Sequence, residues 1–246
     1  TFTHMNNTIT FDGNQEGKTQ LINSGSLVLP FYNVVVNNTG GTSNIVSLST
    51  NKLDVDNNLT LTAGTLDANV SGVQNIDVGG NWLNNGGLYE ARTNTVTFNG
   101  SSNTQQLTSR GAAYNTFYNV TINNTGGSVE LQDSLTMNNT MSLIKGYLNS
   151  NNKNIRLKGH WHVGNGTTYG TFNQGTGDTR ATFFGTSTQN ANLNTDNSTV
   201  NLHDFFFNDV IIDGTDVRFN LDSDTYKILV KLLQINNNKY FKVVHK

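Results

Sequence analysis

The chain has 246 residues, of which 35% are hydrophobic and only 13% are charged, about half the charged fraction of a typical soluble domain. Its 15 basic and 17 acidic residues give a formal net charge of −2, which argues against nucleic acid as a partner. There is no cysteine, so disulfide scaffolds and thiolate zinc sites are excluded. No apolar run approaches the roughly 18 residues that cross a bilayer, and we expect no membrane insertion.

The abundant polar residues are of the kinds that favour strands and turns. Asn and Thr are frequent, and 24 glycines stand against a single proline, Pro30. Asn and Gly accept left-handed backbone angles at turns, whereas Thr favours extended strands. The composition therefore predicts an all-β fold with many short strands.

Four short signatures recur along the chain in a fixed order. The first occupies residues 8–13, 95–100 and 180–185, with the matching phenylalanines 87 and 85 residues apart. The second occupies 31–38, 117–124 and, more loosely, 207–213; the third pairs 59–66 with 141–148, and the fourth pairs 80–82 with 159–161. This order predicts about three imperfect repeats of roughly 85 residues, over 8–94, 95–179 and 180–246, the last incomplete.

Between the signatures, apolar and polar residues alternate in runs of four to six, as at 34–36, 76–78 and 96–98. Each run is bounded by Asn, Gly, Asp or Ser, which indicates strands and turns and almost no helix. We expect one continuous parallel β-solenoid (β-helix) over 1–246. Tandem β-sandwich domains, and less so a propeller, are the alternatives, although the few Asn-Gly hairpin signals favour the solenoid.

The ordered set of residues 59–66, 79–82, 96–100 and 117–124, with a Gln near 105–106, resembles the repeat of very large secreted surface proteins in Bacteroidota and related bacteria. The resemblance covers nearly the whole chain. It implies export to the cell surface or medium, parallel β-helical stacking, and a role in adhesion, gliding or extracellular structure. The third copy departs from it, because it lacks Gly-x-Trp and ends in a more apolar, Lys-bearing stretch, 226–246.

Strand-like patterns begin almost at the first residue and continue to the last, so we expect a fragment of a larger chain. The end of a solenoid is an unpaired sheet edge, and neither end of this chain carries an obvious polar cap. We therefore expect each end to be covered by more of the same chain or by another subunit. Residues 226–233 fit a final strand first, then a capping helix, then a subunit contact.

Two groups of residues have the spacing of metal ligands without the rest of a site. Asp54, Asp56 and Asn58 alternate like the first half of a calcium loop, but the Gly and Glu of such a loop do not follow; Asp213–Asp216 and Asp222–Asp224 are similar. His160 and His162 lie on one face of a strand, yet only Trp161 between them repeats, matching Trp82. We interpret all of these as surface residues and predict no metal, no cofactor and no nucleic-acid site.

No catalytic group is recognisable, and we predict that the protein is not an enzyme. β-Helices that cleave polysaccharides cluster carboxylates on one face, whereas the acidic residues are spread here, and the pairs Glu90–Arg92 and Asp178–Arg180 are expected to be weak and exposed. The leading hypothesis is an extracellular stalk, fibre or surface-layer module that associates through its ends. The second is an adhesin that binds surface glycans through projecting tyrosines (Tyr32, Tyr89, Tyr114, Tyr118, Tyr147 and Tyr169), with Phe31 and Phe117 inside.

Overall fold

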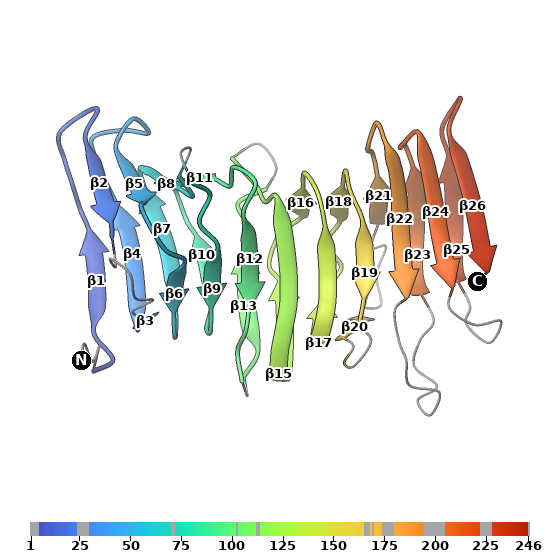
Figure 1. The fold of residues 1–246 in the computed structure, drawn as a ribbon, viewed down its shortest axis with the longest axis horizontal. Coiled ribbons are helices and arrows are strands. Elements are labelled where there is room, and N and C mark those ends of the chain that lie inside the picture. Colours follow the sequence, from blue (N-terminus) through green and yellow to red (C-terminus); the bar gives the residue numbers. More distant parts are fainter. Residues whose placement is uncertain are drawn as a thin grey trace.

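A computed structural model of the chain describes residues 5–23, 30–69, 72–101, 103–111, 114–164, 168, 170–173, 180–193, 205–221 and 228–245. All regular structure in these ranges is β-strand, and the strands stack along one long axis (Figure 1). Every strand pair in the ladders is parallel. The parallel β-solenoid is therefore confirmed, and tandem β-sandwiches, whose strands pair antiparallel, are wrong.

The coils of the solenoid have three faces, which we call the first, second and third face. The first face contains β1 (Thr8–Phe11), β4 (Asn33–Asn37), β7 (Leu59–Ala63), β10 (Trp82–Asn84), β13 (Gln105–Thr108), the second halves of β15 (Asn119–Leu131) and β17 (Met141–Asn149), and β20 (Gly170–Asn173). The second face contains β3 (Pro30–Phe31), β6 (Leu53–Val55), β9 (Ile76–Val78), β12 (Thr95–Phe98), the first halves of β15 and β17, β19 (Trp161–Val163), β22 (Thr188–Leu193), β24 (Asp216–Leu221) and β26 (Tyr240–His245).

The third face consists of two five-stranded sheets. One runs β2 (Thr19–Ile22), β5 (Ile45–Leu48), β8 (Thr65–Asp67), β11 (Leu88–Glu90) and β14 (Asn115–Thr116), and the other β16 (Leu135–Met137), β18 (Ile155–Leu157), β21 (Arg180–Phe183), β23 (Phe205–Ile212) and β25 (Ile228–Ile235). A single bridge, Phe117 to Met137, joins them. The described residues of the stretch 226–233 belong to the strand β25, as its first interpretation predicted, and one further strand, β26, follows.

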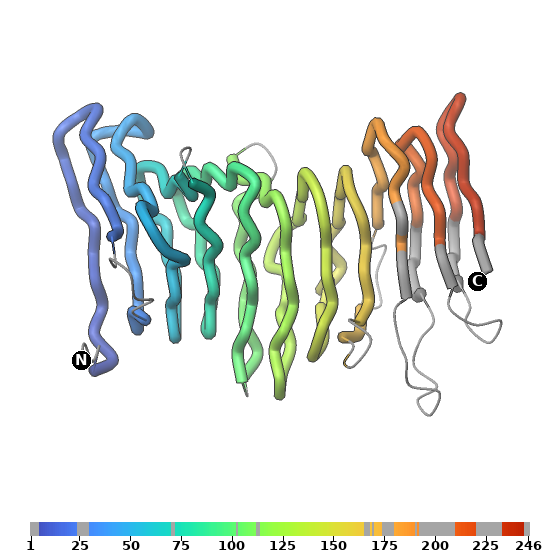
Figure 2. The backbone as a smooth tube through the Cα atoms, in the orientation of Figure 1, coloured from blue at the N-terminus to red at the C-terminus, as the bar shows by residue number. Residues whose placement is uncertain are grey.

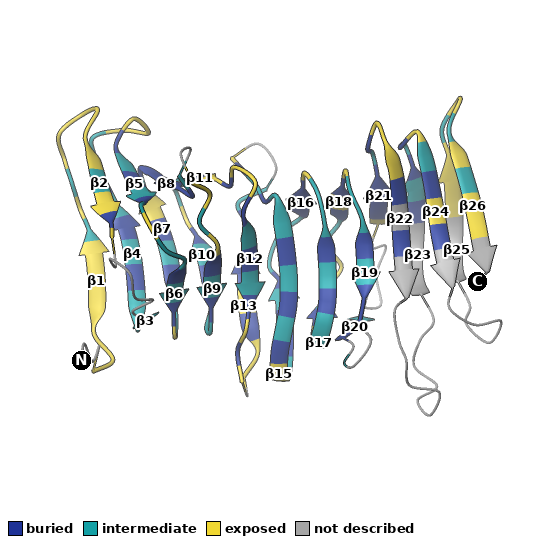
Figure 3. Ribbon diagram, viewed as in Figure 1, coloured by how far each residue is buried: buried dark blue, intermediate teal, exposed yellow. Residues whose placement is uncertain are grey.

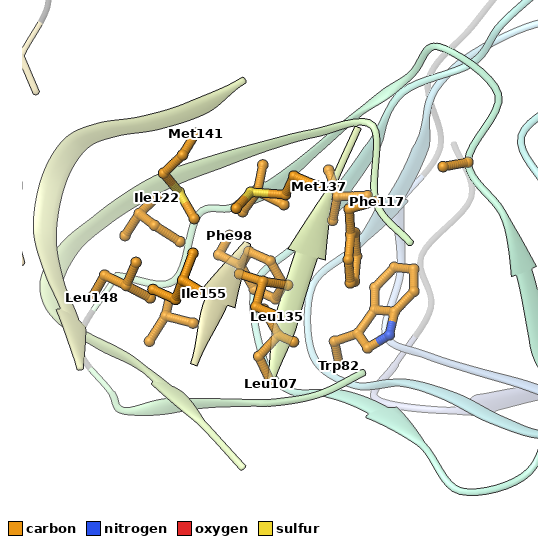
Figure 4. Packing of buried hydrophobic residues seen from close by; sticks show 14 of the residues in the cluster. Trp82, Phe98, Leu107, Phe117, Ile122, Leu135, Met137, Met141, Leu148 and Ile155 are labelled. Atoms are coloured by element: carbon orange, nitrogen blue, oxygen red, sulfur yellow. The ribbon is translucent and has the colours of Figure 1, made fainter. Parts of the chain in front are cut away.

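One apolar core fills the interior between the faces. Alternate residues of each strand point inward and stack on their register partners, as Val34, Leu59 and Trp82 do on the first face. The core extends from Ile22 to Phe219 as one cluster, and buried bands cross the strands along the solenoid (Figure 3). In its middle, Phe117 lies beside Trp82, with the ring centroids 5.1 Å apart (Figure 4).

Asparagine side chains connect successive coils at the strand starts, which explains their abundance. Asn33 Oδ1 accepts the backbone N–H of Asn58 on the next coil at 3.1 Å, Asn58 Oδ1 accepts that of Asn81 at 2.9 Å, and Asn81 Oδ1 accepts that of Gln106 at 2.7 Å. Asn119, the repeat counterpart of Asn33, accepts from Thr140 in the same way. These amides satisfy backbone donors that the turns would leave unpaired.

The sequence repeat is not a whole number of coils. The first signature lies on β1 in the first face, on β12 in the second and on β21 in the third. The two tryptophans follow the same rule, since Trp82 lies in the first face and Trp161 in the second. Each copy of the repeat therefore begins one face further around the solenoid than the copy before it. Figure 2 shows the path of the backbone around the coils. The division into units 8–94, 95–179 and 180–246 stays a prediction.

Candidate interaction sites

At two corners of the solenoid, a buried glutamine ties its coil to the preceding one. Gln105 Nε2 donates to the carbonyls of Val78, at 2.8 Å, and Gly80, and its Oε1 accepts the N–H of Gly100 at 3.0 Å. Gln189 Nε2 donates to the carbonyls of Leu157 and Gly159 at 3.1 and 2.9 Å, and its Oε1 accepts the N–H of Gly185 at 2.7 Å. Both side chains are fully satisfied inside the fold.

This corner explains the glycine that ends the first signature. A Cβ on Gly100 would lie 2.8 Å from Gln105 Oε1 and 2.9 Å from the Gly79 carbonyl. A Cβ on Gly185 would lie 2.9 Å from the Gln189 amide carbon. Glycine is required because the glutamine must approach the backbone closely.

A shallow polar cavity lies beside each of these glutamines, and we call the two cavities the corner grooves. The first, of about 280 Å³, is lined by residues that include Tyr32, Asp56, Gly80, Asn81, Thr104 and Gln105. The second, of about 310 Å³, is lined by residues that include Asn139, Lys158, Gly159, His160, Phe184 and Thr188. The grooves occupy corresponding places in successive copies but different corners, as the shift by one face requires.

The second corner groove has a cationic rim around an aromatic ring. The Arg156 guanidinium lies 4.8 Å from the centroid of the Phe184 ring, and Lys158 Nζ lies 5.5 Å from it. Both distances fall within the range of cation–π contacts. In the first corner groove the aromatic side chain is Tyr32 and the charge is acidic, so the two grooves differ in electrostatics.

A third cavity, of about 350 Å³, lies where the third face is interrupted, and we call it the break groove. Its lining includes Tyr89, Arg92, Tyr114 and Asn115. Asn115 is 1% exposed, and neither atom of its side-chain amide has a hydrogen-bond partner. Tyr114 is 49% exposed, with the Arg110 guanidinium 4.0 Å from its ring centroid.

The end coils expose residues that hold inward positions. At the C-terminal end, Leu233 and Ile235 are 40% and 46% exposed, although their register partners Val210 and Ile212 are buried. Val243 likewise stacks on the buried Phe219 and is itself 40% exposed. At the N-terminal end Ile9 is 37% exposed.

The tyrosines that were predicted to project and bind glycans do not share one face. Tyr89 is buried, with its hydroxyl donating to Asn94 Oδ1, whereas Tyr114 and Tyr147 are exposed. Tyr32 and Tyr118 are half-buried, and Tyr169 lies outside the described residues. Tyr89 and Tyr114 line the same cavity. Of the two phenylalanines expected inside, Phe117 is fully buried and Phe31 is half-buried against the core.

His160 and His162 are adjacent, with ring centroids 5.7 Å apart. Burial, and then the charge of His160, lowers the pKa of His162. In the ranges that the structure describes, no three His, Asp or Glu side chains are placed to hold a metal ion. His162 lies on β19, and His160 directly precedes this strand.

Long-range pairing of the acidic residues could not be read from the sequence. The Asp54 and Asp77 carboxylates are neighbours in register on the second face, and Lys52 binds both. Arg92, expected to pair with Glu90, makes its hydrogen bonds to Asp67 on the preceding coil, at 2.9 and 3.0 Å. A spacing of about one coil separates these partners.

The remaining acidic candidates make ordinary surface contacts. Asp216 binds Arg218 at 2.6 Å, and Asp213 Oδ1 accepts from the Asn236 amide at 2.9 Å. Asp178, Asp222 and Asp224 lie outside the described residues. None of the described members forms a calcium loop.

No helix in the described part of the chain is long and apolar enough to span a membrane. Comparison of the chain with protein-family models, with curated proteins and with solved structures finds no match.

Proposed function

We propose that the chain is a non-enzymatic, extracellular structural and adhesive module, a rigid solenoid segment of a stalk, fibre or surface layer. One observation carries the proposal: a single apolar core runs without a break through the stacked coils, from Ile22 to Phe219. Such a body transmits force along its axis and can be extended by further coils. Its surface is polar and weakly charged, which suits the outside of a cell.

The experiment is to label intact cells of the natural source with an antibody against the chain, and to image the native material by electron microscopy. We expect labelling without permeabilisation, and rods or fibres of uniform width. Labelling only after permeabilisation would contradict the extracellular role. Compact particles instead of rods would contradict the structural role.

Carbohydrate binding is the second candidate function, because the two corner grooves recur in corresponding places. Each combines an aromatic ring with amide and hydroxyl groups, the chemistry that stacks on a sugar ring and bonds its hydroxyls. The two grooves lie at different corners, so one straight glycan could not occupy both. They would instead hold separate glycan chains, which favours cross-linking at a cell surface.

This candidate is tested on a glycan array, followed by titration of any sugar that binds. Tyr32→Ala is expected to weaken binding at the first corner groove about fivefold. Tyr147→Ala, at an exposed tyrosine outside the grooves, is the control and should leave binding unchanged. Equal losses in both variants would contradict a site at the corner groove.

Polysaccharide cleavage is the third and weakest candidate. Burial is the main cause that raises the pKa of Asp54, and the neighbouring Asp77 adds to it. The Lys52 ammonium between the two carboxylates makes an ion-paired surface group the better interpretation.

A further inference from the structure

The two corner grooves contain corresponding residues of two copies of the repeat, but their charges are opposite. The signature that holds the tryptophans extends backwards, so that residues 76–82 match residues 155–161. In this match Arg156 takes the place of Asp77, and Lys158 stands where the first copy has a glycine. The strands β9 and β18 both bury their first and third residues, so Asp77 and Arg156 hold the same outward position in the fold.

The other acidic residues near the first corner groove are also replaced in the second copy. Asp54 and Asp56 correspond to Thr136 and Asn138. Residues 134–177 contain four basic residues and no Asp or Glu, whereas the 133 residues before them contain nine acidic and four basic residues. A local structure that is acidic in one copy is therefore basic in the next.

An aromatic ring holds the two cations together at the second corner groove. Phe184 lines this groove from the next coil and is half-buried. Its N–H donates to the Leu157 carbonyl at 3.0 Å, which places its ring between the neighbours of Leu157 in the sequence. The Arg156 guanidinium lies 4.8 Å and Lys158 Nζ 5.5 Å from the ring centroid. Cation–π contacts at these distances keep both positive groups beside one ring.

No carboxylate neutralises these two cations in the part of the chain that the structure describes. Its ion pairs involve neither Arg156 nor Lys158, and both residues are exposed. One acidic side chain contacts the lining, because Asp216 accepts the hydroxyl of Thr188 at 3.2 Å, but Asp216 is itself paired with Arg218. The groove therefore presents two exposed positive charges to a ligand.

The rest of the lining suits a sugar better than a nucleic acid. It contains two asparagines, and the exposed hydroxyls of Thr186, Ser187 and Thr188 lie beside them. Amides and hydroxyls of this kind bond the hydroxyl groups of a saccharide. A nucleic acid strand is held by a row of cations that follows its phosphates, whereas here two cations meet at one groove.

We propose that the second corner groove binds an acidic polysaccharide, with a carboxylate or sulfate group of one sugar between Arg156 and Lys158. Hydroxyls of the same sugar bond the threonine and serine side chains of the lining. The first corner groove, with Asp56 in its lining, repels such a ligand. Asn138 also lines the break groove, so the two cavities adjoin and the bound sugar can belong to a longer chain. The inference deepens the carbohydrate-binding candidate described above and rests on it.

Isothermal titration calorimetry with matched saccharides tests the class of ligand. The probes are an oligogalacturonate, its fully methyl-esterified form, which has the same sugars without the charge, and a sulfated dextran. We expect at least one acidic probe to bind, and its binding to weaken with added salt, while the ester does not bind. The acidic probe that binds distinguishes a carboxylate from a sulfate ligand.

Three results of these titrations would overturn the proposal. If neither acidic probe binds, the groove does not hold anionic sugars. If the ester binds as tightly as the acid, the charge has no role, although neutral carbohydrate binding would stand. If single-stranded DNA binds as tightly as the saccharides, the attraction is common to all polyanions. None of these results affects rods on labelled cells, which test the structural function separately.

Charge variants locate the site. Lys158→Gln is expected to weaken binding of the acidic probe about fivefold, and Arg156→Asp, which installs the residue of the first copy, about tenfold. Lys145→Gln makes the same change of charge as Lys158→Gln at a lysine outside the groove, and it should leave the affinity unchanged within about twofold. Urea denaturation verifies that all three variants fold. An equal loss in Lys145→Gln would overturn the site, because it would assign binding to overall charge.

Discussion

Gln105 and Gln189 make the same hydrogen bonds at different corners of the solenoid. Each donates to the carbonyl of a glycine on the preceding coil, Gly80 or Gly159, and to the carbonyl two residues before that glycine. The sequence repeat therefore reproduces the local structure of a corner, but it places that corner between different faces in different copies. A function that depends on this corner therefore recurs at different places around the axis.

Replacing a corner glutamine should destabilise the fold more than replacing its exposed neighbour. Gln105→Leu leaves two carbonyls and the Gly100 N–H without their partner, and we expect the free energy of unfolding to fall by about 3 kcal/mol. Gln106→Leu, at an exposed position, is the control and should change it by less than about 0.5 kcal/mol. Both are measured by urea denaturation. Equal effects would show that the corner contributes nothing specific.

Gly146, in the third signature, must be glycine for two reasons, its backbone angle and the close approach of a neighbouring coil, and these two effects can be measured separately. Gly146 has φ +76°, and a Cβ there would collide with the Asn124 carbonyl. Gly111 has the same φ, but a Cβ there would have no atom within 4 Å. Gly111→Ala should therefore cost about 1 kcal/mol from backbone strain alone, and Gly146→Ala about 3 kcal/mol.

Thermal and urea unfolding of the two alanine variants give this comparison directly. A Gly146→Ala protein as stable as Gly111→Ala would mean that the neighbouring coil moves aside at no cost. The repeat of this glycine at Gly64, with φ +77° and a Cβ that would lie 2.7 Å from Asn38 Cβ, makes that outcome unexpected.

The all-β class and the parallel solenoid could be predicted from the sequence because period-two runs and Asn-rich turns are local signals. The relation between repeat and coil could not, because it depends on how many strands each copy contributes. Strands such as β15 continue across a corner without a break, so strand counting fails there. The sequence repeat gives a period of about 86 residues, whereas the fold has a period of about 25, and only the register connects them.

The interaction sites were less predictable for a related reason. Arg92 pairs with Asp67, and Lys52 with Asp77, each across one coil. Ion pairs between residues two apart in the sequence were therefore the wrong prediction for these side chains. The grooves consist of turn residues from successive coils, which have no common motif. The signal that was available is the Gln after each signature glycine, at Gln20, Gln105 and Gln189.

Removing the unpaired amide of Asn115 should stabilise the protein. Asn115 continues an inward stack that contains Leu66 and Tyr89, and its amide has no partner there. Asn115→Leu is expected to raise the free energy of unfolding by about 1 to 2 kcal/mol. Asn124→Leu is the control, since the Asn124 amide donates to the Asn103 carbonyl and to Gln105 Oε1, and it should lower stability. A loss of stability in Asn115→Leu would mean that a bound group satisfies the amide in solution.

Acidification should destabilise the protein through His162. Burial, and then the charge of His160, holds the pKa of folded His162 below its usual value of 6.5. The unfolded chain therefore binds the proton more tightly, and stability is retained above pH 6.5 and lost as the pH falls below it. His162→Gln should reduce the fall in unfolding free energy between about pH 6.5 and 5, and His160→Gln should reduce it less, because burial is the larger cause. The measurement is urea denaturation across this range. An unchanged pH dependence in His162→Gln would assign the acid sensitivity to other groups.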